Sequence, residues 1–554
     1  MKNKLNIGLA FSGGGYRAAA FNLGVLTYLE HIKLDDQSVL DKVTALSTVS
    51  GGTITGACYA MGKKRGEHID DIYQGLYKFM SEVDLVALGI ERLVSEKDWA
   101  PGRVKSLITA FADIYDRELF HNGRFGELMD DDPSFHLRHM SFNATEFSKA
   151  LQFRFQWSEK VVVPRLNEPL RGIIGNYYYQ TPVGIAKDIR MADILAASSC
   201  FPGGFEPINF PDDFVFPETP ALLEFKKDEE HHISLMDGGI VDNQGIEPVL
   251  LADERMQRNQ KDTNPQVPPD VHSLDLIIVS DVSSPYMEEF TSSIQKHMTW
   301  WRKLTPIKVI VINSIVCILG ALGLSFSIVR NFNGLIILFT SILTLNLLIF
   351  VLASSILSMP KKFSILKPFL KPLSKLLRLK FLVYENLLMN RAKSVMKLTG
   401  EIFLKHVRRL NYQKVFADDT WKNRRIMNAI YELKPGEEQL KNKIKQGKIR
   451  PQLVPTREIQ EVAKKAAGMP TTLWFTKEEL EKQHMLDAII ACGQFNLCWN
   501  LLEYIDKIKR DPTNTNENHQ LFVGCEDQIL SDWEKFQVNP FWMVDGFNER
   551  MNVR

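Results

Sequence analysis

Two long uncharged stretches in the middle of the sequence constrain its fold most strongly. The first covers residues 309–329 and the second covers residues 334–357, with a short polar turn between them. As helices they would be about 31 and about 36 Å long, enough to cross a hydrocarbon core of about 30 Å. Such helices must be buried, either in a membrane or in a large soluble core. We predict a two-helix transmembrane hairpin within residues 291–360.

Basic residues on both sides of this hairpin predict its orientation. Lysines and arginines cluster between 296 and 308 and again between 361 and 380, whereas the turn holds only Arg330. By the positive-inside rule, both flanks, and with them the N- and C-terminal regions, are expected in the cytoplasm. Residues 361–388 mix lysine with leucine and phenylalanine. This segment is suited either to an anionic membrane surface or to packing on the protein, and the sequence leaves both open.

The composition excludes several classes of protein. Of 554 residues, 45% are apolar and 24% are charged, so most of the chain can build cores and is not intrinsically disordered. Because 67 basic residues balance 66 acidic ones, we expect no nucleic-acid partner. The cysteines form no CxxC pair, so we expect neither a metal nor a cofactor. The apolar stretch 5–11 is too short for a signal-peptide core, so the mature protein is expected to start near Met1.

The first half of the chain alternates between strand-like and helix-like segments. Strands are predicted at 5–11, 43–49, 151–157, 233–236 and 274–280, and helices at 18–32 and 53–61. Buried strands alternating with helices predict an α/β fold with a mainly parallel sheet between helices, and we assign it to residues 1–290. Polar segments 205–232 and 255–273 are predicted to be loops or insertions. Residues 361–554 are predicted to hold the basic segment and a helical C-terminal region.

The first candidate site follows the first predicted strand. Ser12 is followed by Gly13, Gly14 and Gly15, and then by Tyr16 and Arg17 at the start of a predicted helix. Glycines let the backbone approach a bound group, and a helix N-terminus offers free N–H groups. The site therefore suits a phosphate or a developing oxyanion. The spacing also fits a loose dinucleotide pattern ending in alanine, so a nucleotide remains possible at this stage.

Two further candidates stand at other strand ends. Ser50, followed by Gly51 and Gly52, lies between a strand and a helix, where a sharp turn would expose its hydroxyl as a nucleophile; the alternative is a helix-capping serine. Asp237 is followed by Gly238 and Gly239 and can project into a cleft at the edge of the sheet; the alternative is a simple turn. Together, an anion loop, an exposed serine and a carboxylate are the parts that acyl transfer needs.

These motifs resemble those of the patatin-like phospholipase family. Residues 13–17 match that family's oxyanion loop, Ser50 lies in its G-x-S-x-G elbow, and residues 237–239 match its Asp-Gly-Gly motif. Residues 196–202 and 143–145 resemble two further family segments. The matches occur in family order over residues 5–285, about half of the chain. Thr48 stands at the first glycine of the elbow, so we expect extended backbone there.

The resemblance implies a Ser–Asp dyad that hydrolyses lipid esters. Ser50 would attack the ester carbonyl, Asp237 would accept its proton, and N–H groups of the loop formed by Gly13, Gly14 and Gly15 would bind the oxyanion. Arg17 would hold this loop or lie near a lipid phosphate, and a structural ion pair is the alternative. Membrane lipids are the expected substrates, with the hairpin holding the domain beside them.

Other functions remain open from the sequence. The same dyad could serve a lipid acyltransferase or a neutral-glyceride lipase, and an inactive chain could be a lipid-binding scaffold. A Ser-His-Asp hydrolase would need a histidine after Asp237, such as His272 or His297.

Overall fold

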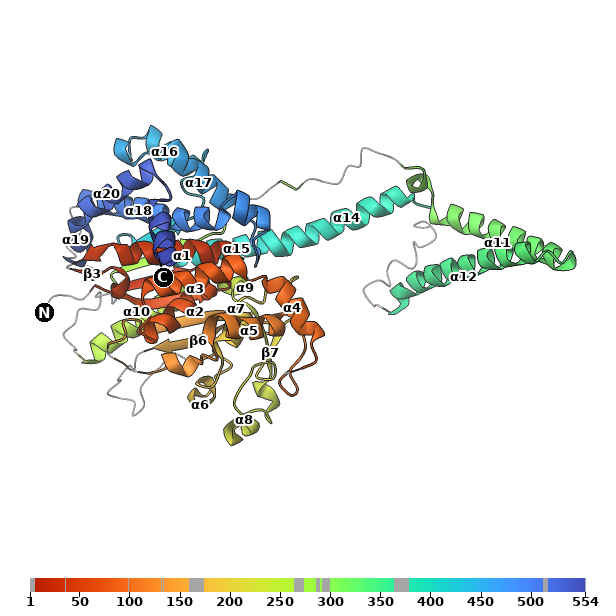
Figure 1. Cartoon of the computed structure of the whole chain (residues 1–554), viewed down its shortest axis with the longest axis horizontal. Coiled ribbons are helices and arrows are strands. Elements are labelled where there is room, and N and C mark those ends of the chain that lie inside the picture. Colours follow the sequence, from red (N-terminus) through yellow and green to blue (C-terminus); the bar gives the residue numbers. More distant parts are fainter. Residues whose placement is uncertain are drawn as a thin grey trace. The chain divides into compact units, whose positions relative to one another are not determined.

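The structure is a computed structural model, shown in Figure 1. It describes all residues except 1–4, 35, 98, 131, 133, 159–173, 264–273, 285–288, 291–298, 363–377, 512–516 and 554. The chain forms two compact units. Met1–Tyr286 and Leu404–Arg554 form the first, here called the sheet unit, and Met287–Phe403 forms the second, here called the hairpin unit. His272 and His297, the candidate bases of a triad, lie outside the described residues.

An eight-stranded sheet lies at the centre of the sheet unit. Its order is β10-β9-β1-β4-β5-β8-β7, with β6 also paired to β5. The five strands from β10 to β5 run parallel, and β6, β8 and β7 are paired antiparallel. The strands are β1 (Ile7–Phe11), β4 (Val43–Val49), β5 (His139–Glu146), β6 (Leu151–Ser158), β7 (Ile208–Phe210), β8 (Ile233–Asp237), β9 (Leu276–Asp281) and β10 (Arg425–Ala429). The predicted α/β fold with a mainly parallel sheet is confirmed.

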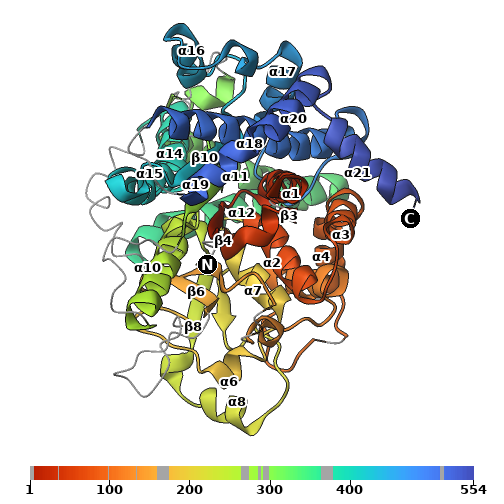
Figure 2. The ribbon, with the colours of Figure 1, turned by 90° about the vertical axis from the view of Figure 1, so that its left-hand side faces the viewer.

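Alternate side chains of the strands pack into two separate cores. In β1, Leu9 and Phe11 belong to the larger core, whereas Ala10 belongs to the smaller one on the opposite face. The larger core holds α1 (Gly15–His31), α2 (Gly51–Lys64) and α18 (Met485–Arg510), and the smaller holds α10 (Ile246–Thr263) and α15 (Leu404–Phe416). Figure 2 shows α18 beside α1, with α10 on the other side of the strands. Both faces of the sheet are therefore covered, as the near-continuous apolar strands predict.

Helices α1 and α18 cross with their backbones in contact. A Cβ placed on Gly24 of α1 would lie 2.1 Å from the carbonyl oxygen of Ile490, and one placed on Gly493 of α18 would lie 2.1 Å from that of Phe21. Only glycine fits at either position. Helix α18 is apolar and long enough to cross a membrane, but 94% of its most apolar stretch is buried inside the sheet unit. It is therefore a core helix, apolar all round because it is surrounded.

The C-terminal region, residues 404–554, contributes more than helices to this unit. Its strand β10 extends the central sheet, which the sequence analysis did not predict. Helix α10 continues to Thr263, so the prediction of a loop from residue 255 was wrong for 255–263. The remaining helices of the sheet unit include α3 (Ile69–Glu82), α4 (Leu85–Val94), α5 (Leu107–Tyr115), α7 (Met191–Ser198), α16 (Glu438–Lys445), α17 (Arg457–Gly468), α19 (Glu517–Gly524), α20 (Glu526–Val538) and α21 (Trp542–Val553).

The hairpin unit contains the two apolar runs as helices. They are α11 (Pro306–Val329) and α12 (Asn333–Lys362), followed by α14 (Phe381–Lys397). The two helices pack closely, since a Cβ on Gly323 would lie 2.4 Å from the ring of Phe339. By length and composition α11 can cross a membrane, and only Gly320 and Ser327 of its residues are buried.

Candidate active site

Ser50 stands on a sharp turn between β4 and α2. Its backbone has φ 51° and ψ −121°, a conformation that non-glycine residues rarely adopt and that marks strained functional turns. The turn is forced by close packing, because a Cβ on Gly51 would lie 2.0 Å from the carbonyl oxygen of Gly15. Thr48 lies within β4 and pairs with both neighbouring strands, so its backbone is extended as expected.

A chain of hydrogen-bonded hydroxyl groups holds this turn in place. The N–H of Ser50 donates to the hydroxyl oxygen of Ser198 at 2.9 Å, and the Ser198 hydroxyl donates to the carbonyl oxygen of Asn143 at 2.7 Å. Thr53 Oγ1 lies 2.8 Å from Ser198 Oγ and 2.9 Å from Thr48 Oγ1. Because the Ser198 proton is used toward Asn143, Thr53 must donate to Ser198 and Thr48 to Thr53. Ser198 lies in the segment 196–202 that resembles a family motif, but its role was not predicted from the sequence.

Asp237 lies near Ser50 because β8 runs antiparallel to its neighbour β5. Strand β8 is antiparallel to β5, with Asp237 opposite Ala144, and Asn143 of β5 is opposite Val49 of β4. Because of this antiparallel direction, β8 ends at the same level of the sheet as β4 does. The Ser50 side chain approaches the Asp237 carboxylate there, closely enough to lower the pKa of that carboxyl group. The two residues on which the sequence prediction depends therefore lie at the ends of strands that both pair with β5.

The surroundings of Asp237 make its carboxylate a stronger base than usual. Its side chain is almost fully buried, and this burial raises its pKa from 3.8 to about 6. The nearby Ser50 side chain and the N–H of Gly239, which donates to Oδ1 at 2.7 Å, favour the charged form and limit the rise in pKa. At neutral pH the carboxylate is ionised and poised to accept a proton.

The glycines after Asp237 are required by close approach of other groups. A Cβ on Gly238 would lie 2.4 Å from the carbonyl oxygen of Asn143, and one on Gly239 would lie 2.5 Å from Oδ1 of Asn243. The motif therefore reflects packing around the carboxylate and not a simple surface turn.

The glycine loop, residues 12–17, lies directly beside Ser50. A Cβ placed on Gly13 would lie 3.1 Å from Cβ of Ser50. A Cβ placed on Gly51 would lie 2.6 Å from the backbone nitrogen of Gly15. The N–H of Gly13 donates to the carbonyl oxygen of Asn243 at 2.9 Å. In the described part of the chain the N–H groups of Gly14 and Gly15 have no acceptor. These two amides are therefore available to a bound anion.

Arg17 is engaged away from the serine. Its Nη1 donates to the carbonyl oxygens of Met469 at 2.5 Å and Ala467 at 3.4 Å. It forms no ion pair with any described carboxylate, and burial lowers its pKa to about 10, so it remains cationic at neutral pH. Of the roles considered from the sequence, the structure favours holding the loop over a salt bridge.

The histidines just before the motif are also engaged elsewhere. The ring of His231 is stacked on Phe225, and Nδ1 of His232 lies 2.6 Å from a carboxylate oxygen of Asp212. Neither contributes to the hydrogen bonds of Asp237.

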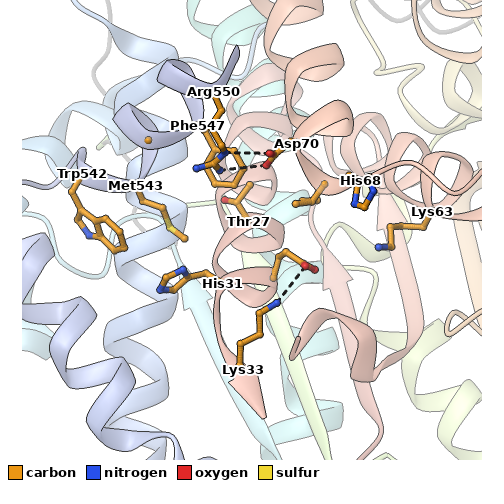
Figure 3. A pocket seen from close by; sticks show the side chains of 13 residues that line it. Thr27, His31, Lys33, Lys63, His68, Asp70, Trp542, Met543, Phe547 and Arg550 are labelled. Atoms are coloured by element: carbon orange, nitrogen blue, oxygen red, sulfur yellow. Dashed lines mark hydrogen bonds and ion pairs between the residues drawn. The ribbon is translucent and has the colours of Figure 1, made fainter. Parts of the chain in front are cut away.

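A cavity of about 540 Å³ lies at the other ends of α1 and α2 (Figure 3). It is lined by His31, Lys63, His68 and residues of α21, and Arg550 pairs with Asp70 at its rim. Helix α1 has 17 residues, about 26 Å in length, so this cavity is remote from the glycine loop.

Comparison with known proteins identifies the domain that carries Ser50 and Asp237. No curated protein matches the chain. Residues 9–250 match the family model described as patatin-like phospholipase, a range that contains the glycine loop, Ser50, Ser198 and the Asp-Gly-Gly motif. This range ends before β9, and therefore before the hairpin unit and the C-terminal region. This match supports a patatin-like phospholipase domain in this part of the chain and, at the level of the family, a lipid acyl hydrolase.

Proposed function

We propose that this protein is a membrane-anchored lipid acyl hydrolase that works through a Ser50–Asp237 dyad. The observation that carries the proposal is the closeness of Ser50, which stands on a strained turn, to Asp237, a buried carboxylate whose pKa it lowers. The position of the glycine loop against Ser50 favours acyl transfer over the nucleotide alternative.

In the acylation step, Ser50 Oγ attacks the ester carbonyl carbon while its proton moves to Asp237. The carbonyl oxygen becomes an oxyanion, and we assign its hydrogen-bond donors to the N–H groups of Gly14 and Gly15. Gly13 supports the loop through its bond to Asn243. When the tetrahedral intermediate collapses, the bond to the alcohol breaks, and Asp237 returns the proton to the leaving alkoxide.

Deacylation repeats these transfers with water. Asp237 takes a proton from the attacking water, the new C–O bond forms, and the acyl–Ser50 bond breaks as the serine oxygen regains a proton. No histidine is required in this sequence of steps. Removal of a single oxyanion donor typically lowers kcat by about 100- to 1,000-fold.

The hairpin unit would place this chemistry at its substrate. Exposed aliphatic side chains such as Ile318, Leu319 and Leu322 cover α11, and a hydrocarbon phase is the environment that suits them. With Arg330 alone at the turn and lysines before the first span, we propose that both ends of the chain are cytoplasmic. Anchoring raises the effective concentration of lipid esters without any new contact.

Activity can be tested with the detergent-purified full-length protein. A fluorophosphonate probe should label Ser50, and a mixed lipid extract should release free fatty acid. The variant Ser50→Ala should do neither. Equal labelling of the variant would reject the nucleophile, and lipid binding without any labelling would favour the scaffold alternative. Adding an acceptor alcohol distinguishes hydrolysis from acyl transfer, because a transferase would form the new ester in place of free acid.

Anchoring has a separate test. After alkaline carbonate extraction the full-length protein should stay in the membrane pellet, and deletion of 306–358 should release it. Release of the full-length protein would refute the transmembrane assignment.

A further inference from the structure

A segment of the C-terminal region, residues 467–476, lies against the glycine loop. The carbonyl oxygen of Thr472 accepts the N–H of Tyr16 at 2.8 Å. A Cβ on Gly15 would lie only 2.2 Å from that oxygen, so the two backbones are in direct contact. This segment lies outside the range matched by the family model, which ends at residue 250.

Three consecutive residues of the loop contact this segment in three different ways. Gly15 provides the close approach, and Tyr16 provides its N–H and its ring, which lies 5.8 Å from the ring of Phe475. Arg17 provides its guanidinium to the carbonyl oxygens of Ala467 and Met469, where α17 ends. A cation that binds the free carbonyls of a helix C-terminus is favoured by both hydrogen bonding and the helix dipole.

The contact with Thr472 also determines which amides remain available. At the N-terminus of α1, the amide groups have no acceptor within the helix. The carbonyl oxygen of Thr472 accepts the N–H of Tyr16, and that of Asn243 accepts the N–H of Gly13. The N–H groups of Gly14 and Gly15 therefore stay available between two fixed neighbours. Donors held in this manner need no reorganisation when charge develops on the substrate.

We propose that residues 467–476 clamp the glycine loop in its catalytic conformation, and that Arg17 is a positioning residue that acts through the carbonyl groups of this segment. The inference rests on the proposed function, since it assigns the oxyanion donors to this loop. The clamp is not needed to attach the C-terminal region, because the glycine contact between α1 and α18 already does so. The effect of the clamp is local to the glycine loop. Small misplacements of catalytic groups are costly, because a shift of about 1 Å can lower the rate about 100-fold.

The test compares Arg17→Gln with Arg550→Gln in the full-length protein. Arg550 also joins the C-terminal region to the N-terminal half, through Asp70, but lies at the remote cavity. Hydrogen exchange is followed in peptides covering 10–20 and 465–478, and kcat and KM are measured on a soluble short-chain ester. For Arg17→Gln we expect faster exchange in both peptides and a fall in kcat of about 10- to 100-fold, with KM within about threefold. Arg550→Gln should match the wild type in kcat and in both peptides.

Several outcomes would overturn the proposal. A kcat for Arg17→Gln within about twofold of wild type would show that the clamp is dispensable. Lower kcat with unchanged exchange would mean that Arg17 acts on the substrate itself. Equal losses in both variants would indicate general destabilisation.

A second variant covers the case in which Arg17→Gln fails to fold. Arg17→Lys keeps a cation near the carbonyl groups and should give intermediate exchange and intermediate kcat; wild-type kcat with fast exchange would refute the clamp. If the wild type itself has no Ser50-dependent activity, the proposed function fails, whereas hydrogen exchange still decides whether Arg17 holds the two segments together.

Discussion

Replacing Asp237 by asparagine should abolish activity and yet stabilise the protein at neutral pH. With a pKa of about 6 instead of 3.8, the folded state binds the Asp237 proton more tightly than the unfolded state does. Keeping this carboxylate charged at pH 7 therefore costs about 3 kcal/mol, since each tenfold change in proton affinity corresponds to about 1.4 kcal/mol. Asparagine has no charge to bury, and its amide oxygen can still accept the N–H of Gly239.

The diagnostic quantity is the pH dependence of the difference in stability between Asp237→Asn and the wild type. Well below pH 3.8 both states of the wild type hold the proton, so the cost disappears; it grows as pH rises from about 3.8 to about 6 and is nearly constant above. Effects of the asparagine on packing do not change with pH. The stability gained by Asp237→Asn over wild type should therefore rise by about 2.4 kcal/mol from pH 4 to pH 7.

Thermal melting followed by tryptophan fluorescence in a non-ionic detergent measures this difference. At pH 7 the variant should melt several degrees above wild type, and the gap should narrow toward pH 4. The exposed substitution Asp228→Asn is the control for removing one negative charge. A gap that stays constant over this pH range would refute the burial argument, and retained ester hydrolysis by Asp237→Asn would refute the dyad.

Three further outcomes follow from the geometry of the site and core. Hydrolysis of a soluble ester should rise about tenfold between pH 5 and pH 7, because with a pKa near 6 only about a tenth of Asp237 is ionised at pH 5; a flat profile would contradict its role as base. Ser198→Ala should lower kcat by about 10- to 100-fold, since the hydroxyl accepts the N–H of Ser50 and holds the strained turn; an unchanged kcat would show that the turn holds without it. Gly493→Ala should destabilise the protein by about 1–3 kcal/mol or more, whereas Gly75→Ala, with open space around it on α3, should stabilise it by about 0.5–1 kcal/mol; equal melting temperatures for the two variants would contradict the close helix contact.

The sequence was sufficient for the elements that carry strong local patterns. Strand β4 has the predicted bounds, 43–49, because an apolar run ends abruptly at Ser50 and two glycines. The helix after the glycine loop was predicted to start at residue 18 and begins at Gly15, since φ values of 147° and 59° at Gly14 and Gly15 turn the chain directly into the helix. The proximity of Ser50 and Asp237 was inferred from motif order and family resemblance.

Long-range contacts explain what the sequence did not reveal. Strand β10 is short and partly polar, and it forms because β9 offers it an unpaired edge. Antiparallel pairing of β8 depends on its partner β5 and not on its own residues. The bond between Tyr16 and Thr472 joins positions 456 residues apart, a separation that no local pattern encodes. Helix α10 was underestimated because its second half is polar, as expected for a solvent-facing end.

The division of the sheet unit between the two ends of the chain has a consequence for biosynthesis. The edge of β9 and the apolar face of α1 are completed only by residues 425–429 and 485–510, which the ribosome makes after the entire hairpin. Until then the nascent chain carries an open strand edge and an uncovered helix, both of which favour aggregation. We expect the nascent chain to depend on chaperones until α18 has emerged.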